Sequence, residues 1–144
     1  MRALSLWQPW ASLMAAGLKT IETRDWPTRY RGPLAIHAAK RPLSGEEKAL
    51  LYIWACKGMI PAAWLDSEPL PYGAILAVAN LVDCARVENV SPGRLDEAFG
   101  NYAPGRWAWI TRNLRALPHP IPYRGAQGLF DVPTKIIEKG GAMK

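Results

Sequence analysis

The stretch LSLWQPWASLMAAGLKTIETRDWPTRYRG, residues 4–32, concentrates the unusual chemistry of this chain. It holds three of the seven tryptophans, and it places a lysine, a glutamate and an arginine within residues 19–24. Alternating apolar residues predict a strand over 3–7, and apolar residues at helical spacing then predict a helix over 8–16. Gly17 fits the left-handed position just past the end of that helix.

Outward from this stretch, short apolar runs alternate with turns rich in proline and glycine. Alternation and β-branched content predict further strands over residues 19–26, 32–39, 73–87, 106–114, 121–123 and 128–132. We expect helices after Ser44 and over 133–139, single helical turns near 62–64 and 94–99, and a loop over 58–72. Five to seven strands with a few helices predict an α+β fold built on a small mixed β-barrel.

The helix after Ser44 is expected to bury the stripe formed by Leu50, Leu51, Ile53 and Trp54 and to end at Gly58. The two cysteines, Cys56 and Cys84, form no CxxC pair, so we expect both to be reduced and buried.

Composition favours one domain spanning residues 1–144 with a basic surface. The chain has a net charge of +6 and a pI of about 9.6. Residues 1–41 hold seven cations but only two acids, Glu22 and Asp25. Such a patch attracts polyanions, although a solvated basic face is the alternative.

Several classes of protein are disfavoured by the sequence. The two histidines, His37 and His119, show no metal-ligand spacing, so neither a metal nor another cofactor is expected. The N-terminus lacks the features of a signal peptide, and no apolar run approaches the ~18–20 residues that span a membrane. We therefore expect a cytoplasmic protein with no membrane partner.

Three charged residues in the opening stretch have the chemistry of a phosphate or base contact. Lys19 and Arg24 each carry donors for a phosphate, and the planar guanidinium of Arg24 binds it in bidentate fashion. Glu22 accepts hydrogen bonds only, from either cation or from the exocyclic amine of a base. Trp10 or Trp26 offers a face for base stacking, and Arg106, beside a glycine, is placed to reach the site.

Structural roles are the alternatives for most of these residues. Glu22 and Arg24 are also compatible with an exposed ion pair of little energetic consequence. We expect Trp7 in the core, whereas Trp10 fits the core and a binding wall equally. His37, in an apolar strand, is expected to be a structural histidine. Trp107 and Trp109 are expected to pack inside the barrel, and Tyr102 is a further stacking candidate.

Taken in order, these motifs resemble the ASCH domain, named after the activating signal cointegrator. The resemblance runs over most of residues 3–132, and its strongest parts are QPWA, residues 8–11, and the GxKxxExR pattern of residues 17–24. The later parts are RGxLxIHA, YGAIL, VDC and GRWAW, at residues 31–38, 72–76, 82–84 and 105–109.

The resemblance implies a PUA-like β-barrel with a helix after the first strand and one or two further helices. It also implies a cleft beside that helix that binds RNA, expected to be single-stranded, or a nucleotide, with DNA as an alternative partner. The cleft residues carry over to Trp10, Lys19, Glu22 and Arg24. Arg31 and His37 are further candidates.

The family also contains small hydrolases that remove the acetyl group of acetylcytidine, and others proposed to cleave RNA. The deacetylase pattern has a threonine nucleophile three residues after the lysine, where this chain has Glu22. As an enzyme, this chain would instead need Lys19 and Glu22 as an acid–base pair. Asp96 and Glu97 are candidates for a distant carboxylate. We therefore rank binding first and hydrolysis second.

Overall fold

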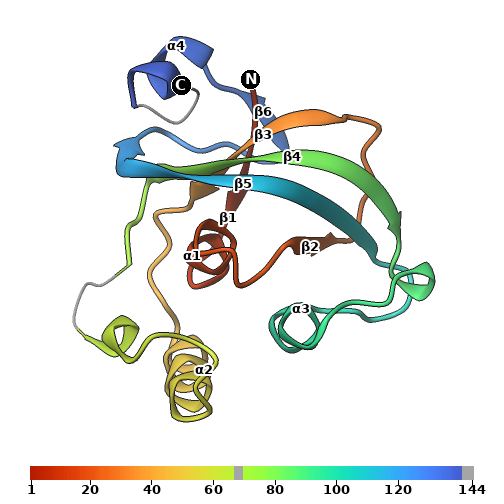
Figure 1. Ribbon diagram of the computed structural model, residues 1–144, viewed down its shortest axis with the longest axis vertical. Coiled ribbons are helices and arrows are strands. Elements are labelled where there is room, and N and C mark those ends of the chain that lie inside the picture. Colours follow the sequence, from red (N-terminus) through yellow and green to blue (C-terminus); the bar gives the residue numbers. More distant parts are fainter. Residues whose placement is uncertain (67–69, 141–144) are drawn as a thin grey trace.

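The computed structural model describes residues 1–66 and 70–140 of the 144. Within them, one six-stranded sheet curves into a half-barrel with strand order β2-β5-β4-β3-β1-β6 (Figure 1). The strands are β1 (Arg2–Leu6), β2 (Ile21–Arg24), β3 (Gly32–Ala38), β4 (Ala74–Arg86), β5 (Trp107–Pro122) and β6 (Leu129–Asp131). The helices are α1 (Trp10–Ala15), α2 (Gly45–Cys56), α3 (Arg94–Phe99) and α4 (Thr134–Lys139). The predicted α+β fold on a mixed barrel-like sheet of five to seven strands is confirmed, with six strands that form a half-barrel.

The chain between β1 and β3, residues 7–31, forms a crossover connection. β1 and β3 pair in parallel, with Leu4 opposite Ile36, whereas the other pairs in the sheet are antiparallel. A parallel pair needs a crossover connection, and here α1 and β2 lie within it. β2 does not return to β1 but joins the far edge of the sheet against β5. The crossover therefore spans the concave side of the half-barrel.

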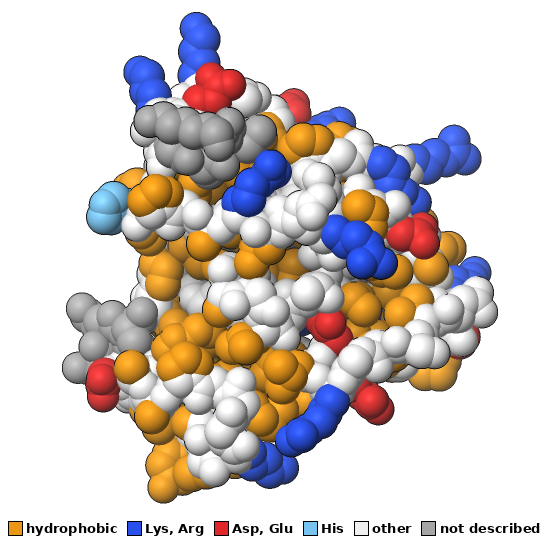
Figure 2. Space-filling model, in the orientation of Figure 1, with side chains coloured by type: hydrophobic (Ala, Val, Ile, Leu, Met, Phe, Trp, Pro, Cys, Tyr) orange, Lys and Arg blue, Asp and Glu red, His pale blue; other side chains and the backbone are white. Residues whose placement is uncertain are grey.

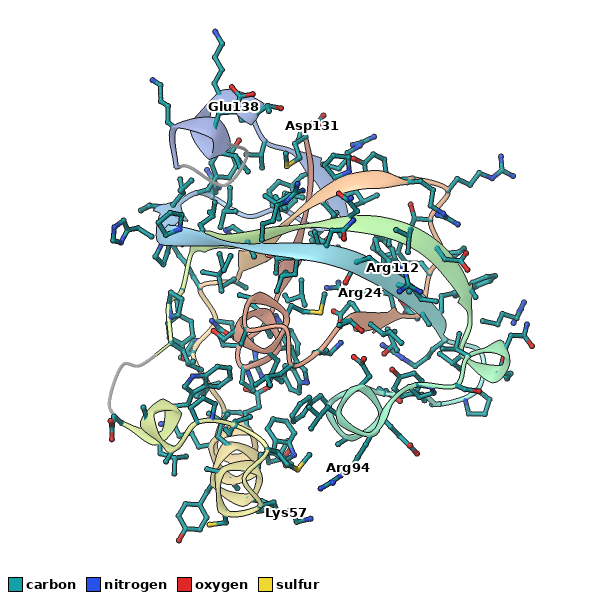
Figure 3. The ribbon with its side chains drawn as sticks, viewed as in Figure 1. Arg24, Lys57, Arg94, Arg112, Asp131 and Glu138 are labelled. Atoms are coloured by element: carbon teal, nitrogen blue, oxygen red, sulfur yellow. The ribbon has the colours of Figure 1, made fainter. Side chains whose placement is uncertain are left out.

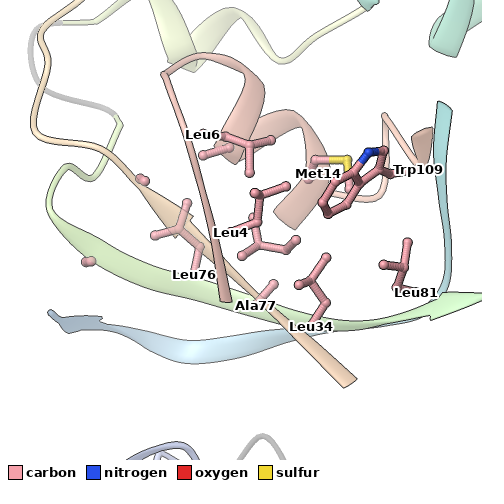
Figure 4. Packing of buried hydrophobic residues seen from close by; sticks show 12 residues of the cluster. Leu4, Leu6, Met14, Leu34, Leu76, Ala77, Leu81 and Trp109 are labelled. Atoms are coloured by element: carbon pink, nitrogen blue, oxygen red, sulfur yellow. The ribbon is translucent and has the colours of Figure 1, made fainter. Parts of the chain in front are cut away.

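The principal core lies between α1 and the sheet (Figure 4). Leu4 and Leu6 of β1, Met14 of α1 and Trp109 of β5 are each at most 1% exposed and belong to one cluster with Leu34 of β3. Close packing here fixes where α1 sits, because a shift of the helix would open a cavity among these side chains.

The strands β4 and β5 are long and strongly curved. Their pairing contains three register shifts, and each such irregularity bends a strand and increases its twist. β5 continues to Pro122, opposite Ala74, so the expected separate strand over 121–123 is the end of β5. The prediction of two strands was wrong because the bulged pairing carries β5 through Pro118 and Pro120.

The helix α2 begins as the sequence predicts. Ser44 caps it, and the Ser44 hydroxyl and the Glu47 side chain form a reciprocal capping box. Its predicted buried stripe is only half correct, because Leu51 and Trp54 are buried whereas Leu50 and Ile53 are 36% and 46% exposed. The helix packs through one narrow side against Leu13, Ile60, Leu70 and Phe99.

The remaining boundaries differ slightly from expectation. α1 begins at Trp10 after a turn at Gln8–Pro9, and β2 begins at Ile21, so Lys19 lies in the preceding turn. Gly17 has a φ of +74°, the left-handed conformation that its position requires. Both cysteines are free as expected, but neither is fully buried: Cys56, on α2, is exposed and Cys84 is half-buried. The predicted loop over 58–72 includes 67–69, which lie outside the described residues.

Candidate functional site

A pocket of about 480 Å³ opens where the end of β1, the start of α1 and the strand β2 face α2 and α3. We call it the first pocket. Its size falls within the range of small-ligand sites in proteins. Of the predicted site residues, Trp10, Glu22, Arg24 and Arg106 line it. Figure 2 shows hydrophobic side chains gathered over the α2 side of the molecule, where this pocket opens.

The charged centre of the pocket is a linked set of three side chains. Glu22 Oε1 accepts a hydrogen bond from Lys19 Nζ at 2.9 Å, and Glu22 Oε2 lies 3.1 Å from Arg24 Nε and 3.0 Å from its Nη2. Lys19 also donates to the carbonyl of Ile21. Arg24 donates from Nη2 to the carbonyl of Ser5, at 2.9 Å, which ties β2 to the end of β1.

The three side chains differ in burial: one is fully buried, and the other two are partly exposed to the pocket. The Lys19 side chain is 1% exposed and lies beneath the pocket, whereas the Glu22 and Arg24 side chains are 14% and 24% exposed. In this arrangement the Lys19 ammonium does not reach a ligand directly, unlike the phosphate contact expected from the sequence. It neutralises Glu22 from below, and Arg24 presents the accessible charge at the centre of Figure 3.

The carboxyl of Glu22 stays ionised. Burial by itself raises the pKa of Glu22, but the Lys19 ammonium and the Arg24 guanidinium, through charge and hydrogen bonds, outweigh burial and hold that pKa below its usual range. General acid–base work at neutral pH needs a carboxyl whose pKa is raised. The ion-paired geometry therefore opposes the acid–base role that the hydrolase alternative gives to Lys19 and Glu22.

Arg106 provides a second guanidinium on the pocket wall. Its Nη2 donates to the carbonyl of Thr23 at 2.9 Å, which fixes the side chain against β2. Its buried Nε has no hydrogen-bond partner within the described residues. A buried unpaired donor of this kind costs about 1–3 kcal/mol.

Tyr102 lies beside this wall but does not line the pocket. Its buried hydroxyl also has no partner among the described residues. Burial, together with the negative charges of Asp96, Glu22 and Glu97, raises the pKa of Tyr102 to about 12. The ring packs against Ile21, Val87 and Ala108, so the stacking role suggested for Tyr102 does not fit its position.

Aromatic side chains form the rest of the wall. Trp10 is half-buried, and its Nε1 donates to the carbonyl of Phe99 at 2.9 Å, which joins α1 to α3. Trp54 and Phe99 meet edge to face with ring centroids 4.8 Å apart. Trp7, expected in the core, is 54% exposed and lines the pocket mouth. The prediction failed because Trp7 follows the last residue of β1, where strand alternation no longer directs side chains inward.

The other predicted site residues lie elsewhere. Trp26 packs edge to face on Trp109, with ring centroids 4.7 Å apart, so it supports the core and does not line the first pocket. Arg31 lies 3.7 Å from the carboxylate of Asp83 and lines a separate shallow depression. Trp109 is buried as expected, whereas Trp107 is half-buried with the Arg86 guanidinium 4.9 Å from its ring centroid.

His37 is buried in β3 and hydrogen-bonded at both ring nitrogens. It is 1% exposed, its Nε2 lies 2.7 Å from the carbonyl of Tyr123, and its Nδ1 lies 2.9 Å from Ser5 Oγ. A carbonyl only accepts, so Nε2 carries the proton and, in the neutral ring, Nδ1 accepts from the Ser5 hydroxyl. Burial lowers the pKa of His37, opposed by the hydrogen bond to Tyr123. The ring borders a second pocket, on the other side of Ser5.

The two candidates for a distant carboxylate do not reach the first pocket's charged centre. Asp96 Oδ1 accepts from the backbone N–H of Thr20 at 2.7 Å and of Ile21 at 3.0 Å, and Oδ2 accepts from the Thr20 hydroxyl at 2.8 Å. Asp96 therefore fastens α3 to the start of β2. Glu97 is exposed and does not line the first pocket.

The structure adds pocket residues that the sequence did not indicate. They come from the end of β1, from α2 and from the segment at the end of α3: Ser5, Trp54, Phe99, Gly100 and Asn101. No spacing along the chain links these segments to β2, because only the packing of α2 and α3 against α1 brings them together.

No group of three or more His, Cys, Asp or Glu side chains in ranges 1–66 and 70–140 is arranged to hold a metal ion. Likewise, none of the helices in these ranges has the length and apolar character needed to cross a membrane.

The half-barrel, with α1 packed against β3 and β4, defines a mixed α+β domain. The sequence profile of the ASCH domain matches residues 4–120, and the chain belongs to the ASCH domain family. It is 28% identical over 144 residues to human activating signal cointegrator 1 and 29% identical over 147 residues to the mouse protein. Both alignments cover 98% of this chain but only 24% of the relative, so the chain spans about a quarter of those proteins.

Solved structures agree with the fold. The crystal structure of ASCH from Zymomonas mobilis superposes with a TM-score of 0.53 at 15% identity, covering 96% of this chain and 91% of that one. A mutant form of the same protein also gives 0.53 at 15% identity, covering 96% and 94%. At this identity the likeness concerns the fold alone.

Proposed function

We propose that this ASCH domain binds RNA or a nucleotide in the first pocket, with Arg24 and Arg106 as phosphate or base contacts and aromatic side chains as the stacking wall. The observation that carries the proposal is the convergence of two guanidinium groups, each already oriented by a protein carbonyl, on one aromatic-lined pocket.

The charge of the site suits an anionic ligand. Lys19, Arg24 and Arg106 supply three cations around the single carboxylate of Glu22. Glu22 also restricts the geometry of Arg24, because its Oε2 accepts a hydrogen bond from Arg24 Nε and forms an ion pair with Nη2. A cation held in place before binding loses less conformational freedom when the ligand arrives.

The aromatic part of the pocket suits a base. Trp10, Trp54 and Phe99 offer flat apolar surface, and base–aromatic stacking contributes ~1–3 kcal/mol per base. Accessible, unstacked bases are a property of single strands, so single-stranded RNA is favoured over duplex RNA or DNA. The ASCH family is associated with RNA binding, in agreement with this proposal.

Binding is favoured over hydrolysis for a specific reason. A hydrolase needs a nucleophile or a base in the pocket, and Glu22 is committed to two cations at 2.9–3.1 Å. Deacetylation of acetylcytidine and cleavage of RNA remain predictions of lower rank.

The test is a titration of fluorescent single-stranded RNA with wild-type protein and with Arg24→Gln and Arg106→Gln. Loss of one charged hydrogen-bonding group costs about 1.5–3 kcal/mol, so each variant is expected to bind roughly 10- to 100-fold more weakly. Arg112→Gln is the matched control, since Arg112 is exposed on β5 and lines neither pocket. Circular dichroism would verify that each variant is folded.

Two results would contradict the proposal. One is RNA affinity that is unchanged in both pocket variants. The other is an equal loss in Arg112→Gln, which would mean that RNA responds only to the overall charge of the chain.

A further inference from the structure

The first pocket has a neighbour that shares one of its walls. A second pocket of about 930 Å³ lies between the end of β3 and the loop that follows β5, and Ser5 lines both pockets. The Ser5 hydroxyl faces His37, at 2.9 Å, on the side of the second pocket, whereas the Ser5 carbonyl holds Arg24 of the first pocket. The two pockets are therefore separated by little more than the end of β1.

The second pocket is basic. Its lining includes Lys40 and Arg124 and, among residues 1–66 and 70–140, no aspartate or glutamate. Both cations are exposed, and burial lowers the pKa of His37, which also lines this pocket. The stem of Lys40 packs on Gly73, where an added Cβ would lie 2.9 Å from Lys40 Cγ. This contact holds the lysine stem along the pocket wall.

A preformed contact joins the two pockets along their rim. Arg41, the residue after Lys40, lies over the Trp7 ring with its Cζ 4.0 Å from the ring centroid. Glu47 holds that guanidinium through a hydrogen bond of 2.8 Å. Trp7 lines the first pocket and Lys40 lines the second, so residues 40–41 continue the basic, aromatic surface from one pocket to the other.

We infer that the two pockets form one binding track for a single-stranded polynucleotide. A base occupies the first pocket, and a backbone phosphate of a flanking nucleotide is bound by Lys40 and Arg124 in the second. This inference rests on the proposed function and specifies its ligand as an oligonucleotide rather than a free nucleotide. A mononucleotide fills one pocket only, whereas adjacent nucleotides of one strand reach both.

The test compares a mononucleotide with a single-stranded RNA pentanucleotide by isothermal titration calorimetry over a series of salt concentrations. The variant is Lys40→Met/Arg124→Met, because methionine keeps an unbranched stem on Gly73 while removing the charge. Its control is Lys57→Met/Arg112→Met, which removes the same two residue types at exposed positions outside both pockets (Figure 3).

We expect the wild-type protein to bind the pentanucleotide at least tenfold more tightly than the mononucleotide. The Lys40/Arg124 variant should lose that advantage while its mononucleotide affinity stays unchanged. Each phosphate contact in a single strand contributes about 0.7 to the slope of log K against log salt, so loss of the one phosphate held by Lys40 and Arg124 lowers the slope by about 0.7. The control variant should change the slope by clearly less.

Equal wild-type affinity for the two ligands, or an unchanged slope in the Lys40/Arg124 variant, would overturn the two-pocket track and leave the first pocket intact as a nucleotide site. The same slope change in both double variants would also overturn it. If neither ligand binds the wild-type protein, the proposed function itself fails, and the track fails with it.

Discussion

Replacing Glu22 by glutamine should destabilise the protein strongly, because Glu22 compensates a buried lysine. The Lys19 side chain is 1% exposed, and its ammonium has the Glu22 carboxylate at 2.9 Å as its charged partner. Removing one member of a buried ion pair costs about 3–5 kcal/mol, since the other charge is left buried and unpaired. Domains are stable by about 5–15 kcal/mol, so this loss is a large fraction of the total.

The measurement is urea unfolding of Glu22→Gln, Lys19→Met and the double variant, which together form a double-mutant cycle. Lys19→Met removes the buried charge, so Glu22→Gln should cost much less in that background. We therefore expect the double variant to be more stable than Glu22→Gln alone. A cost below about 1 kcal/mol for Glu22→Gln, or an equal cost in both backgrounds, would refute the assigned role.

The pH dependence of stability supplies an independent readout of the same pair. The folded-state pKa of Glu22 lies below its ordinary value of 4.5, so its contribution to stability is fully present above pH 4.5. That contribution is lost as the pH falls through the lowered pKa and Glu22 becomes protonated. Wild-type stability should therefore fall more steeply below pH 4.5 than that of Glu22→Gln, and parallel curves would contradict the ion-pair account.

Three further predictions concern local structure and chemistry. Gly17→Ala should cost about 1–2 kcal/mol, because Gly17 has a φ of +74°, whereas Gly45→Ala, with open space around the added Cβ, should cost nothing measurable in thermal unfolding. Ser44→Ala should cost about 1 kcal/mol by urea unfolding through loss of the α2 cap, and an unchanged midpoint would contradict that role. Incubation with acetylcytidine should release no acetate detectable by chromatography, and turnover abolished by Lys19→Met would restore the hydrolase alternative.

Sequence patterns predicted most helix and strand positions well, because helix caps and apolar periodicity depend only on neighbouring residues. Ser44 followed by Glu47 specifies a helix start, and Gly17 specifies a helix end, whatever the rest of the chain does. The strand β5 was predicted less well. Its alternating part was found, but its continuation to Pro122 depends on pairing with β4, a partner more than thirty residues away in the chain.

The site was predicted only in part, because local patterns place neighbouring residues together but do not show how distant segments pack. Glu22 and Arg24 share one side of β2, and the local pattern already placed them together. The pattern did not show that Lys19 turns inward beneath them, since a lysine is almost never fully buried unless it is paired. Trp7, expected in the core, is exposed, whereas Trp26, expected in the binding site, packs on the core. The exposure of a side chain depends on what packs against it rather than on its type.

The sequence by itself determined the succession of most strands and helices along the chain, because periodicity and helix caps are properties of adjacent residues. It also determined the basic character of the first 41 residues and, through its motifs, the membership of the family. Only the tertiary structure decided which cations face a ligand. Arg106 directly precedes β5 and lies about eighty residues beyond Arg24 in the chain, and the aromatic wall comes from α1, α2 and α3. These groups meet because the crossover between β1 and β3 folds into the half-barrel and the helices close over it, a result of packing that no local pattern encodes.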